Sequence, residues 1–270
     1  MDLLLEGKVA IVTGSTGICR AAAQALAEEN ANLAITYLTE SDKRAAKENI
    51  KICENKGQKG IFLHLDVRDL DEISSVIDKV LQEFGKIDVL VNSAGVSTAA
   101  LAEEVSEKLW DLDVDIDLKG LFFCCKEVFV KAMKKQRYGN IVNISSVCGV
   151  KPVRTNPMYG AAKAGVINIT QYLAVEWGNF NIRVNAISPG WIDNFFELPP
   201  EEQEKWADNE AVSRTIPMGR FGKAIEIGRI ISFLASERSS FINGSNIIAD
   251  GGMIAGIRLA SLKDGKIEMF

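Results

Sequence analysis

The sequence is poor in histidine, in proline and in excess positive charge. Its 270 residues include one histidine, His64, and six prolines, so a mechanism that needs two imidazoles is excluded and no proline-rich linker divides the chain. Lysine and arginine number 31 against 36 aspartates and glutamates, and this net charge of −5 gives no general attraction to nucleic-acid phosphates. We therefore expect no nucleic-acid partner.

Long apolar runs and paired cysteines are missing as well. No charge-free stretch approaches the roughly 18–20 residues that cross a bilayer, and the first eight residues lack a basic segment followed by a long apolar one. The cysteines are odd in number and contain no Cys-x-x-Cys pair, which is typical of buried, reduced thiols and argues against a zinc site. They are Cys19, Cys53, Cys124, Cys125 and Cys148. We expect a cytoplasmic protein with no metal and no membrane association.

Short β-rich apolar runs alternate with amphipathic stretches along the whole chain, as they do in βαβ units around a parallel sheet. Strands are predicted at 9–12, 33–37, 61–65, 89–91, 140–144, 183–187 and 246–249. Helices are predicted at 18–29, 42–56, 70–84, 109–135, 159–178 and 223–236. The sequence thus predicts an α/β fold, a single doubly wound Rossmann-type domain over residues 1–270 with a seven-stranded parallel sheet.

One connection, residues 190–217, is longer than an ordinary loop, and we expect it to cover the substrate site and to contain a short helical piece. It combines aromatic with acidic side chains, which suits either a pocket wall or an amphipathic surface helix. The single histidine lies in the third predicted strand, so we expect a structural role for it.

Small residues follow two of the predicted strands. The first strand runs into Gly14-Ser15-Thr16-Gly17-Ile18 and then a helix, and the fourth ends in Asn92-Ser93-Ala94-Gly95. The first turn lets backbone amides and the positive end of a helix face an anion such as a dinucleotide pyrophosphate, although such turns also serve packing alone. Because parallel strands end at one edge of a sheet, both turns are expected to line one crevice.

A tyrosine and a lysine are spaced for acid–base chemistry. Tyr159 and Lys163 are four residues apart on a predicted helix, so they share a face, and a neighbouring cation favours the phenolate. Taken alone, such a pair also stacks harmlessly on a helix surface. Ser146, which follows the fifth predicted strand, lies thirteen residues before Tyr159 and supplies a hydroxyl.

In this order, the four motifs resemble the short-chain dehydrogenase/reductase family across nearly the whole chain. The resemblance extends to residues 185–190, 217–222, 233–236 and 250–252. In that family a hydride moves between a nicotinamide and a carbonyl or secondary-alcohol carbon, while a tyrosine gives or takes the proton on oxygen. The resemblance therefore implies an NAD(P)-dependent enzyme similar to 3-oxoacyl reductases and hydroxysteroid dehydrogenases.

The resemblance also assigns roles by position. Tyr159 is the implied acid/base, Ser146 holds the substrate oxygen, and Lys163 lowers the tyrosine pKa and bonds the nicotinamide ribose. Asp117 takes the place of an asparagine that acts in the family largely through its main-chain carbonyl. The implied cofactor-binding residues are Gly14, Ser15, Thr16, Gly17, Ile18, Tyr37, Leu38, Asp66, Val67, Asn92, Ala94, Gly95, Tyr159, Lys163, Pro189, Gly190 and Ile192.

Four departures from the family pattern bear on function. The glycine turn is one residue short, and Cys19 replaces its last glycine, where a Cβ crowds the helix–strand contact. Ser93 stands for an asparagine, and Asn194 for a threonine. Asp117 puts a carboxylate near Lys163 and so alters the proton relay. These departures leave a catalytically weak nucleotide-binding scaffold as an alternative.

The end of the second predicted strand bears on cofactor choice. Tyr37 stands where an acidic residue would bond the ribose of NAD, and Leu38 stands where the family has its usual arginine. Because no carboxylate at that position repels a phosphate and Lys43 and Arg44 follow, we favour NADP(H) over NAD(H). Glu40 could instead favour NAD.

The substrate and partners are expected from the covering loop and from the family. A bulky apolar ketone or alcohol such as a steroid or bile acid suits the aromatic loop; the alternatives are a 3-oxoacyl thioester on an acyl carrier protein and a sugar or polyol. A carrier protein is acidic and needs a basic docking surface, to which Lys131, Lys134, Lys135 and Arg137 could contribute. The family resemblance further implies a homotetramer built through the two long helices and the last strand.

Overall fold

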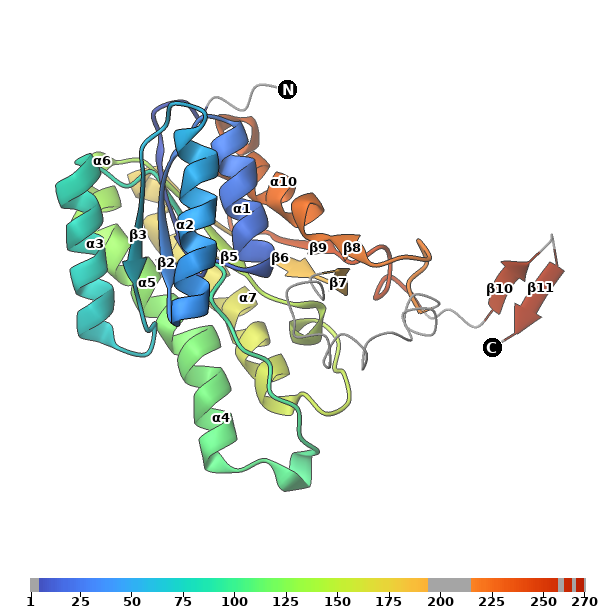
Figure 1. Ribbon diagram of the computed structural model, residues 1–270. Helices are drawn as coiled ribbons and strands as arrows, with labels where there is room; N and C mark the ends of the chain where they lie inside the picture. The colour runs from blue at the N-terminus through green and yellow to red at the C-terminus, as the bar shows by residue number, and fades with distance from the viewer. Residues whose placement is uncertain (1–4, 194–214, 257–259, 264–265, 270) are drawn as a thin grey trace.

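The computed structural model describes residues 5–193, 215–256, 260–263 and 266–269. A parallel sheet lies at its centre, with its strands in the order β3-β2-β1-β4-β5-β6-β9 (Figure 1). The strands are β1 (Val9–Thr13), β2 (Asn32–Tyr37), β3 (Gly60–His64), β4 (Val89–Asn92), β5 (Gly139–Ile144), β6 (Ile182–Pro189) and β9 (Asn246–Ala249). This confirms the doubly wound fold, and the strand order reverses between β1 and β4.

Helices cover both faces of the sheet because the strands are apolar on both sides. On one face lie α1 (Gly17–Glu28), α2 (Glu40–Glu54) and α10 (Ala224–Ala235), and on the other lie α3 (Leu70–Phe84), α5 (Leu121–Val128) and α7 (Pro157–Trp177). Strand β1 shows the alternation: Ala10 and Val12 pack toward the first set, Val9 and Ile11 toward the second.

The helix predicted at 109–135 is a composite of α-helical and π-helical segments. Its parts are α4 (Glu107–Val114), the π-helical η2 (Asp115–Gly120), α5, the π-helical η3 (Phe129–Met133) and α6 (Lys134–Gln136). Gly120 ends the first π segment, where a Cβ would lie 2.5 Å from the carbonyl oxygen of Val67. The long helix therefore packs closely on the β3–α3 connection, and its π turn carries Asp117.

Two small sheets were not expected from the sequence. Strands β7 (Ile192–Asp193) and β8 (Gly222–Lys223) pair in parallel, and β10 (Ala260–Lys263) pairs with β11 (Lys266–Met269) in an antiparallel hairpin. The hairpin stands apart from the main sheet in Figure 1. The predicted covering loop at 190–217 lies mostly outside the described residues, as does Asn194.

The described cysteines are all free thiols. Four are buried as expected, whereas Cys148 is partly exposed and lies in the short 3-10 helix η4 (Val147–Gly149) that follows β5. In the described part of the chain, no helix combines the length and apolar character that a bilayer crossing requires.

Candidate active site

The turn after β1 has the backbone of an anion cradle. Gly14 and Gly17 have φ angles of 93° and 54°, a region that side chains disfavour. The Gly14 amide donates to the Thr36 hydroxyl at 3.0 Å, and the Ser15 hydroxyl donates to the Asp42 carbonyl at 2.9 Å. The turn is thus tied to the end of β2 and the start of α2, and it places the amino end of α1 at the carboxyl edge of the sheet.

Two residues that the sequence analysis did not single out hold this crevice together. The buried side-chain amide of Asn49, on α2, donates to the Ser15 backbone carbonyl at 2.8 Å. The Thr13 hydroxyl at the end of β1 accepts from the Ser93 and Ala94 amides, at 3.0 and 3.1 Å. For Asn49 the sequence offers one indication of a structural contact: it is a polar residue on the buried, otherwise apolar face of α2.

Cys19 fits the shortened turn without displacing it. Its thiol is buried, lies 3.7 Å from the Ser93 carbonyl oxygen, and would be 2.6 Å from a Cβ built on Gly14. The thiol of Cys19 is therefore accommodated only because Gly14 has no Cβ.

The end of β4 offers buried polar atoms to this crevice. The Asn92 side-chain nitrogen donates to the Asn143 side-chain oxygen at 2.9 Å, but the Asn92 side-chain oxygen Oδ1 and the Ser93 hydroxyl, both buried, have no partner within the described residues. Buried polar atoms of this kind call for a ligand or water. Together with the open glycine turn, they fit a dinucleotide that runs across the ends of β1 and β4. The contact of Asn92 with the ribose remains a prediction.

The structure brings Ser146, Tyr159 and Lys163 together at the carboxyl end of β5. Ser146 is buried and its hydroxyl accepts from the Cys148 amide at 3.2 Å. Tyr159, in the first turn of α7, lies near enough to Ser146 for the serine hydroxyl to lower its pKa, and the Lys163 ammonium lies 5.6 Å from the centre of the tyrosine ring. This is the face-sharing that the spacing of four predicted. Lys163 also donates to the Ile144 carbonyl at 3.0 Å.

Burial and nearby charges set the acid–base character of this group. Burial raises the pKa of Tyr159 above its ordinary value; the Lys163 cation opposes the rise and the Asp117 carboxylate adds to it. Burial by itself would lower the pKa of Lys163, but Asp117 and Tyr159 outweigh it, so the pKa of this ammonium is raised. The lysine thus stays charged beside a protonated phenol.

Two buried carboxylates support the segment after β4. Asp117 lies 3.0 Å from the Lys163 ammonium and accepts from the Val96 amide at 3.3 Å. Asp113, one turn earlier on the helix, accepts from the Thr98 hydroxyl at 2.9 Å. Asp113 was not singled out from the sequence, although its spacing of four from Asp117 places both on one face.

The end of β2 holds the groups expected to choose the cofactor. The Lys43 ammonium lies 5.7 Å from the ring centre of Tyr37 and pairs with the exposed Glu40 at 3.2 Å. The His64 ring packs edge-on against Tyr37 and pairs with Glu72, which raises the pKa of His64 through a hydrogen bond. His64 thus contacts Tyr37 and Glu72 at the end of β2 and the start of α3, and its structural role remains a prediction.

The remaining predicted cofactor residues line the same edge of the sheet. The Asp66 carboxylate is held by Arg68, chiefly through hydrogen bonds that lower its pKa, while Val67 is buried. The Gly190 amide donates to the Ala249 carbonyl at 3.0 Å, and a Cβ on Gly190 would lie 2.7 Å from the Cβ of Asp250. Leu38 is exposed, whereas Pro189 and Ile192 end β6 and begin β7. Their contacts with a cofactor remain predictions.

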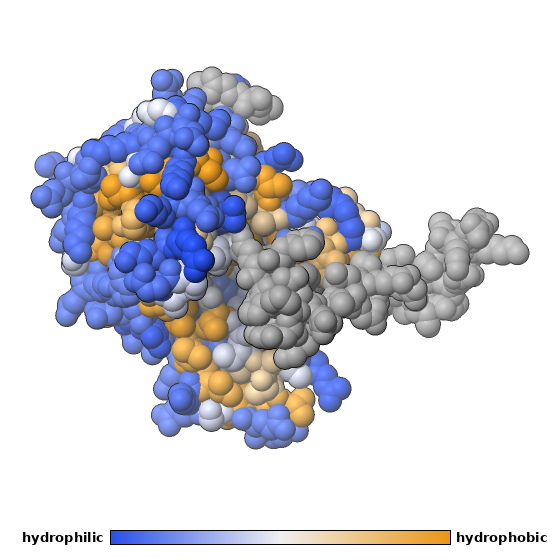
Figure 2. Space-filling view, in the orientation of Figure 1, coloured by the Kyte–Doolittle hydropathy of each residue, from blue (hydrophilic) through white to orange (hydrophobic). Residues whose placement is uncertain are grey.

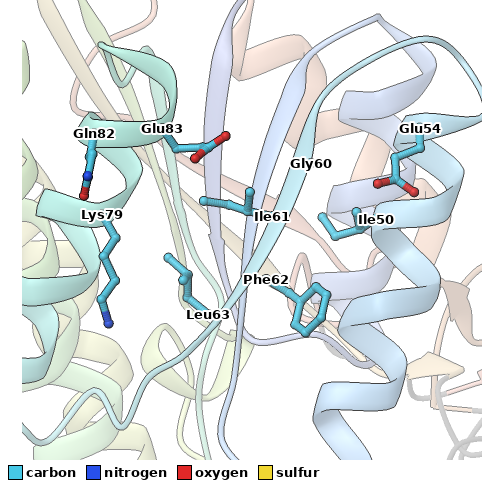
Figure 3. A pocket seen from close by; sticks show the side chains of 9 residues that line it. All are labelled: Ile50, Glu54, Gly60, Ile61, Phe62, Leu63, Lys79, Gln82 and Glu83. Carbon is cyan, nitrogen blue, oxygen red and sulfur yellow. The ribbon is translucent and has the colours of Figure 1, made fainter.

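An open groove of about 640 Å³ lies away from these residues, over edge strand β3 between α2 and α3 (Figure 3). Its floor is apolar, and Glu54, Lys79 and Glu83 lie at its rim. It contains none of the predicted site residues. We therefore place the chemistry at the carboxyl edge of the sheet, where titratable groups converge, and not in this groove.

A doubly wound sheet with a glycine turn at its switch point and a Ser–Tyr–Lys group beside it defines a dinucleotide-dependent oxidoreductase. A family model described as Enoyl-(Acyl carrier protein) reductase matches residues 12–254. The 3-oxoacyl-(acyl-carrier-protein) reductase FabG of Thermotoga maritima is 41% identical over 253 residues, which are 93% of this chain and 99% of that protein. Glucose 1-dehydrogenase 2 of Bacillus subtilis is 34% identical over 251 residues, 92% and 95% of the two chains.

A solved structure agrees with these relatives. A putative short-chain alcohol dehydrogenase from Sinorhizobium meliloti superposes with a TM-score of 0.87 at 37% identity, and the match covers 95% of this chain and all of that one. The chain belongs to the short-chain dehydrogenase/reductase family and is an NAD(P)-dependent oxidoreductase. The expected steroid or bile-acid substrate finds no support in these comparisons, and the 3-oxoacyl thioester alternative fits them better.

Proposed function

We propose that the protein reduces a 3-oxoacyl thioester on an acyl carrier protein, with NADPH as the favoured cofactor and Tyr159 as the proton donor. The observation that carries this proposal is the contact of Tyr159 with Ser146 and Lys163 at the carboxyl end of β5. The reductase from Thermotoga maritima, which is similar along nearly its whole length, supports the substrate class.

Each residue of the group has a defined role in this reaction. The bound nicotinamide supplies the hydride. The Ser146 hydroxyl holds the 3-oxo oxygen, and the Tyr159 hydroxyl gives it a proton as negative charge develops there. The Lys163 ammonium, fixed by the Ile144 carbonyl and the Asp117 carboxylate, stabilises the phenolate left behind and bonds the ribose. Asp117 replaces the side chain of the family's asparagine and reaches the relay through Lys163.

The preference for NADPH rests on charge at the end of β2. Glu40, the carboxylate that would favour NAD, is paired with Lys43 and points its charge to solvent. The exposed Arg44 follows on α2 and is available to a 2′-phosphate. We expect Arg44→Ala to raise the KM for NADPH several-fold and to leave the KM for NADH unchanged.

A carrier protein needs basic groups near the site entrance. The run Lys131, Lys134, Lys135 and Arg137 precedes β5, so within one subunit it lies at the end of the sheet opposite Ser146. Lys131 is moreover held by Asp78 and Glu127. Exposed Lys151 and Arg154, in the loop between Ser146 and Tyr159, are better placed for this docking.

Exposed apolar side chains support a homotetramer. Trp110 on α4 and Tyr172 and Val175 on α7 are exposed, and so are Phe241 and Ile248 near edge strand β9. Figure 2 shows apolar surface over the lower part of α4. Large apolar groups gathered at a surface are typical of interfaces. We expect Val175→Asp to yield smaller assemblies in sedimentation without loss of fold.

The substrate class is tested by comparing kcat/KM for three carbonyl or alcohol substrates with both dinucleotides. We expect a 3-oxobutanoyl thioester with NADPH to exceed a steroid ketone with NADPH, and glucose with NAD or NADP, by at least about a hundredfold, which is a barrier difference of about 2.7 kcal/mol. A preference for glucose would assign the chain to sugar oxidation, and equal rates would refute the proposed specificity. Reversing the charges of Lys151 and Arg154 should lower turnover of the carrier-protein thioester more than that of a small thioester.

A further inference from the structure

The Tyr159–Lys163 pair is flanked by two carboxylates that are completely buried. Asp113 and Asp117 are both 0% exposed, and they lie one helical turn apart on α4 and η2. Burial of an unpaired carboxylate is costly, so each must have a partner. Asp113 accepts from the Thr98 hydroxyl, whereas Asp117 faces the lysine.

Packing fixes the distance between the Asp117 carboxylate and the Lys163 ammonium at 3.0 Å. Gly95 covers this pair: a Cβ built there would be 2.5 Å from Asp117 Oδ1 and 3.4 Å from Lys163 Nζ. The Val96 amide holds the carboxylate from one side, and the Ile144 carbonyl holds the ammonium from the other. The ion pair thus belongs to the resting fold and does not await a ligand.

The charge around the tyrosine can be counted from the elements that pack against it. The titratable groups are Lys163 on α7, Asp117 and Asp113 on the long helix, Cys148 after β5 and Cys19 on α1. They comprise one cation and two carboxylates. A lysine alone would favour the phenolate, but a carboxylate 3.0 Å from that lysine opposes its field at the ring.

We propose that Asp117 is the built-in counter-charge of Lys163, a positioning residue that keeps the Tyr159 hydroxyl protonated in the resting enzyme and poises the site for carbonyl reduction. The inference rests on the proposed function. In reduction, the Tyr159 O–H bond breaks as the proton passes to the carbonyl oxygen, whose carbon receives the hydride of the reduced dinucleotide. The phenolate then regains a proton from solvent. Alcohol oxidation needs the phenolate as base and is held back.

Removing only the Asp117 charge should shift the ionisation of Tyr159 in a known direction. Asp117→Asn keeps the shape of the side chain and leaves Lys163 as an uncompensated cation beside the phenol. We expect tyrosinate to appear at a pH about one unit lower or more, a tenfold change in the ionisation constant. Asp115→Asn is the matched control, because Asp115 is a half-exposed residue of the same π turn that pairs with Lys119.

The experiment is a near-ultraviolet titration of tyrosinate that needs no substrate. The signal of Tyr159 is isolated by subtracting the Tyr159→Phe version of each protein. A downward shift in Asp117→Asn with no shift in Asp115→Asn supports the proposal. If tyrosinate forms in Asp117→Asn at the same pH as in wild type, or at a higher pH, the proposal is overturned.

A second variant decides the matter if Asp117→Asn does not fold. Lys163→Met combined with Asp117→Asn removes both charges, a change that buried pairs tolerate. If the two charges cancel at the tyrosine, its titration should stay within about one unit of wild type. A larger upward shift would mean that Lys163 had dominated and that Asp117 was not its counter-charge.

Activity separates this inference from the proposed function. The pH profile for alcohol oxidation should move to lower pH in Asp117→Asn, in step with the titration. A shifted titration without turnover of any carbonyl substrate would refute the proposed function and leave the charge balance standing. Thioester turnover without a shift would refute the inference alone.

Discussion

The carboxyl edge of the sheet carries ion pairs in two different environments. On the nucleotide side, the ion pairs at the ends of β2 and β3 are exposed: Glu40 with Lys43, and Glu72 with His64. On the catalytic side, Asp117 and Lys163 are buried and enclosed by backbone. Water screens the first kind of pair, whereas the second kind keeps its field and its desolvation cost. We therefore expect substitutions at the end of β2 to change the cofactor preference more readily than substitutions around Asp117 and Lys163 are tolerated.

The largest effect is expected from the proton donor itself. Tyr159→Phe removes the hydroxyl that we propose protonates the carbonyl oxygen, so turnover should fall by about 10² to 10⁴, the usual contribution of general acid catalysis. The measurement is kcat for NADPH-dependent reduction of the thioester. Tyr172→Phe, an exposed tyrosine of the same helix, is the control and should retain full activity. Comparable losses in both variants would contradict the assignment.

The contribution of the buried Asp117–Lys163 ion pair to the free energy of unfolding is measured by removing its cation. Lys163→Met leaves the Asp117 carboxylate buried without a cation, and we expect a loss of about 3–5 kcal/mol in the free energy of unfolding. Adding Asp117→Asn should restore most of it. Urea denaturation measures both, with exposed Lys43→Met as the control that should leave stability unchanged. Equal losses in the single and double variants would show that the pair is not coupled.

The Thr13 hydroxyl connects the end of β1 to the segment after β4, and its removal should have the next largest effect. Thr13→Val leaves the half-buried Ser93 and Ala94 backbone amides without this acceptor and should cost about 1–3 kcal/mol of unfolding free energy. Thr13→Ser keeps the oxygen and should recover most of this loss. If Thr13→Val matches wild type in thermal unfolding and in the KM for NADPH, the two strand ends are held by other contacts.

The smallest effect is expected at the exposed His64–Glu72 pair. Its hydrogen bond with Glu72 raises the pKa of His64 above 6.5, so the stabilisation is full below pH 6.5 and is lost as the pH rises through the folded-state pKa. Because the histidine side chain is 48% exposed, His64→Gln should cost less than about 1 kcal/mol on the acid side. Unfolding curves at acid and alkaline pH check the sign. A difference that grows with rising pH would contradict it.

The sequence predicted the order of elements because local chemistry marks it. The helix expected at 70–84 is Leu70–Phe84 in the structure, where the Asp69 carboxylate accepts from the Asp71 and Glu72 amides and Gly85 ends the helix with a φ of 76°. The π-helical segments were missed, because an apolar pattern over a long helix does not distinguish i→i+5 from i→i+4 hydrogen bonding. Its turn at Asp115–Gly120 follows instead from close packing at Gly120.

In the candidate site, relations between residues close in sequence were predictable, whereas contacts between distant residues were not. Tyr159 and Lys163 were predictable together because a spacing of four on a helix is a local relation. The Asp113–Thr98 and Asn49–Ser15 contacts join residues 15 and 34 positions apart, so no local pattern announces them. The acceptance of Cys19 in a shortened turn likewise depends on the bare Cα of Gly14.

One fluorescence titration shows whether the carboxyl edge of the sheet is an NADPH-dependent reductase site. NADPH is added to the wild-type protein until binding saturates, and a 3-oxobutanoyl thioester is then added to the same sample. We expect saturable binding followed by loss of the NADPH signal, and binding without loss in Tyr159→Phe. Binding without loss in the wild type would favour a nucleotide-binding scaffold, and no binding would contradict the cradle at Gly14 and Gly17.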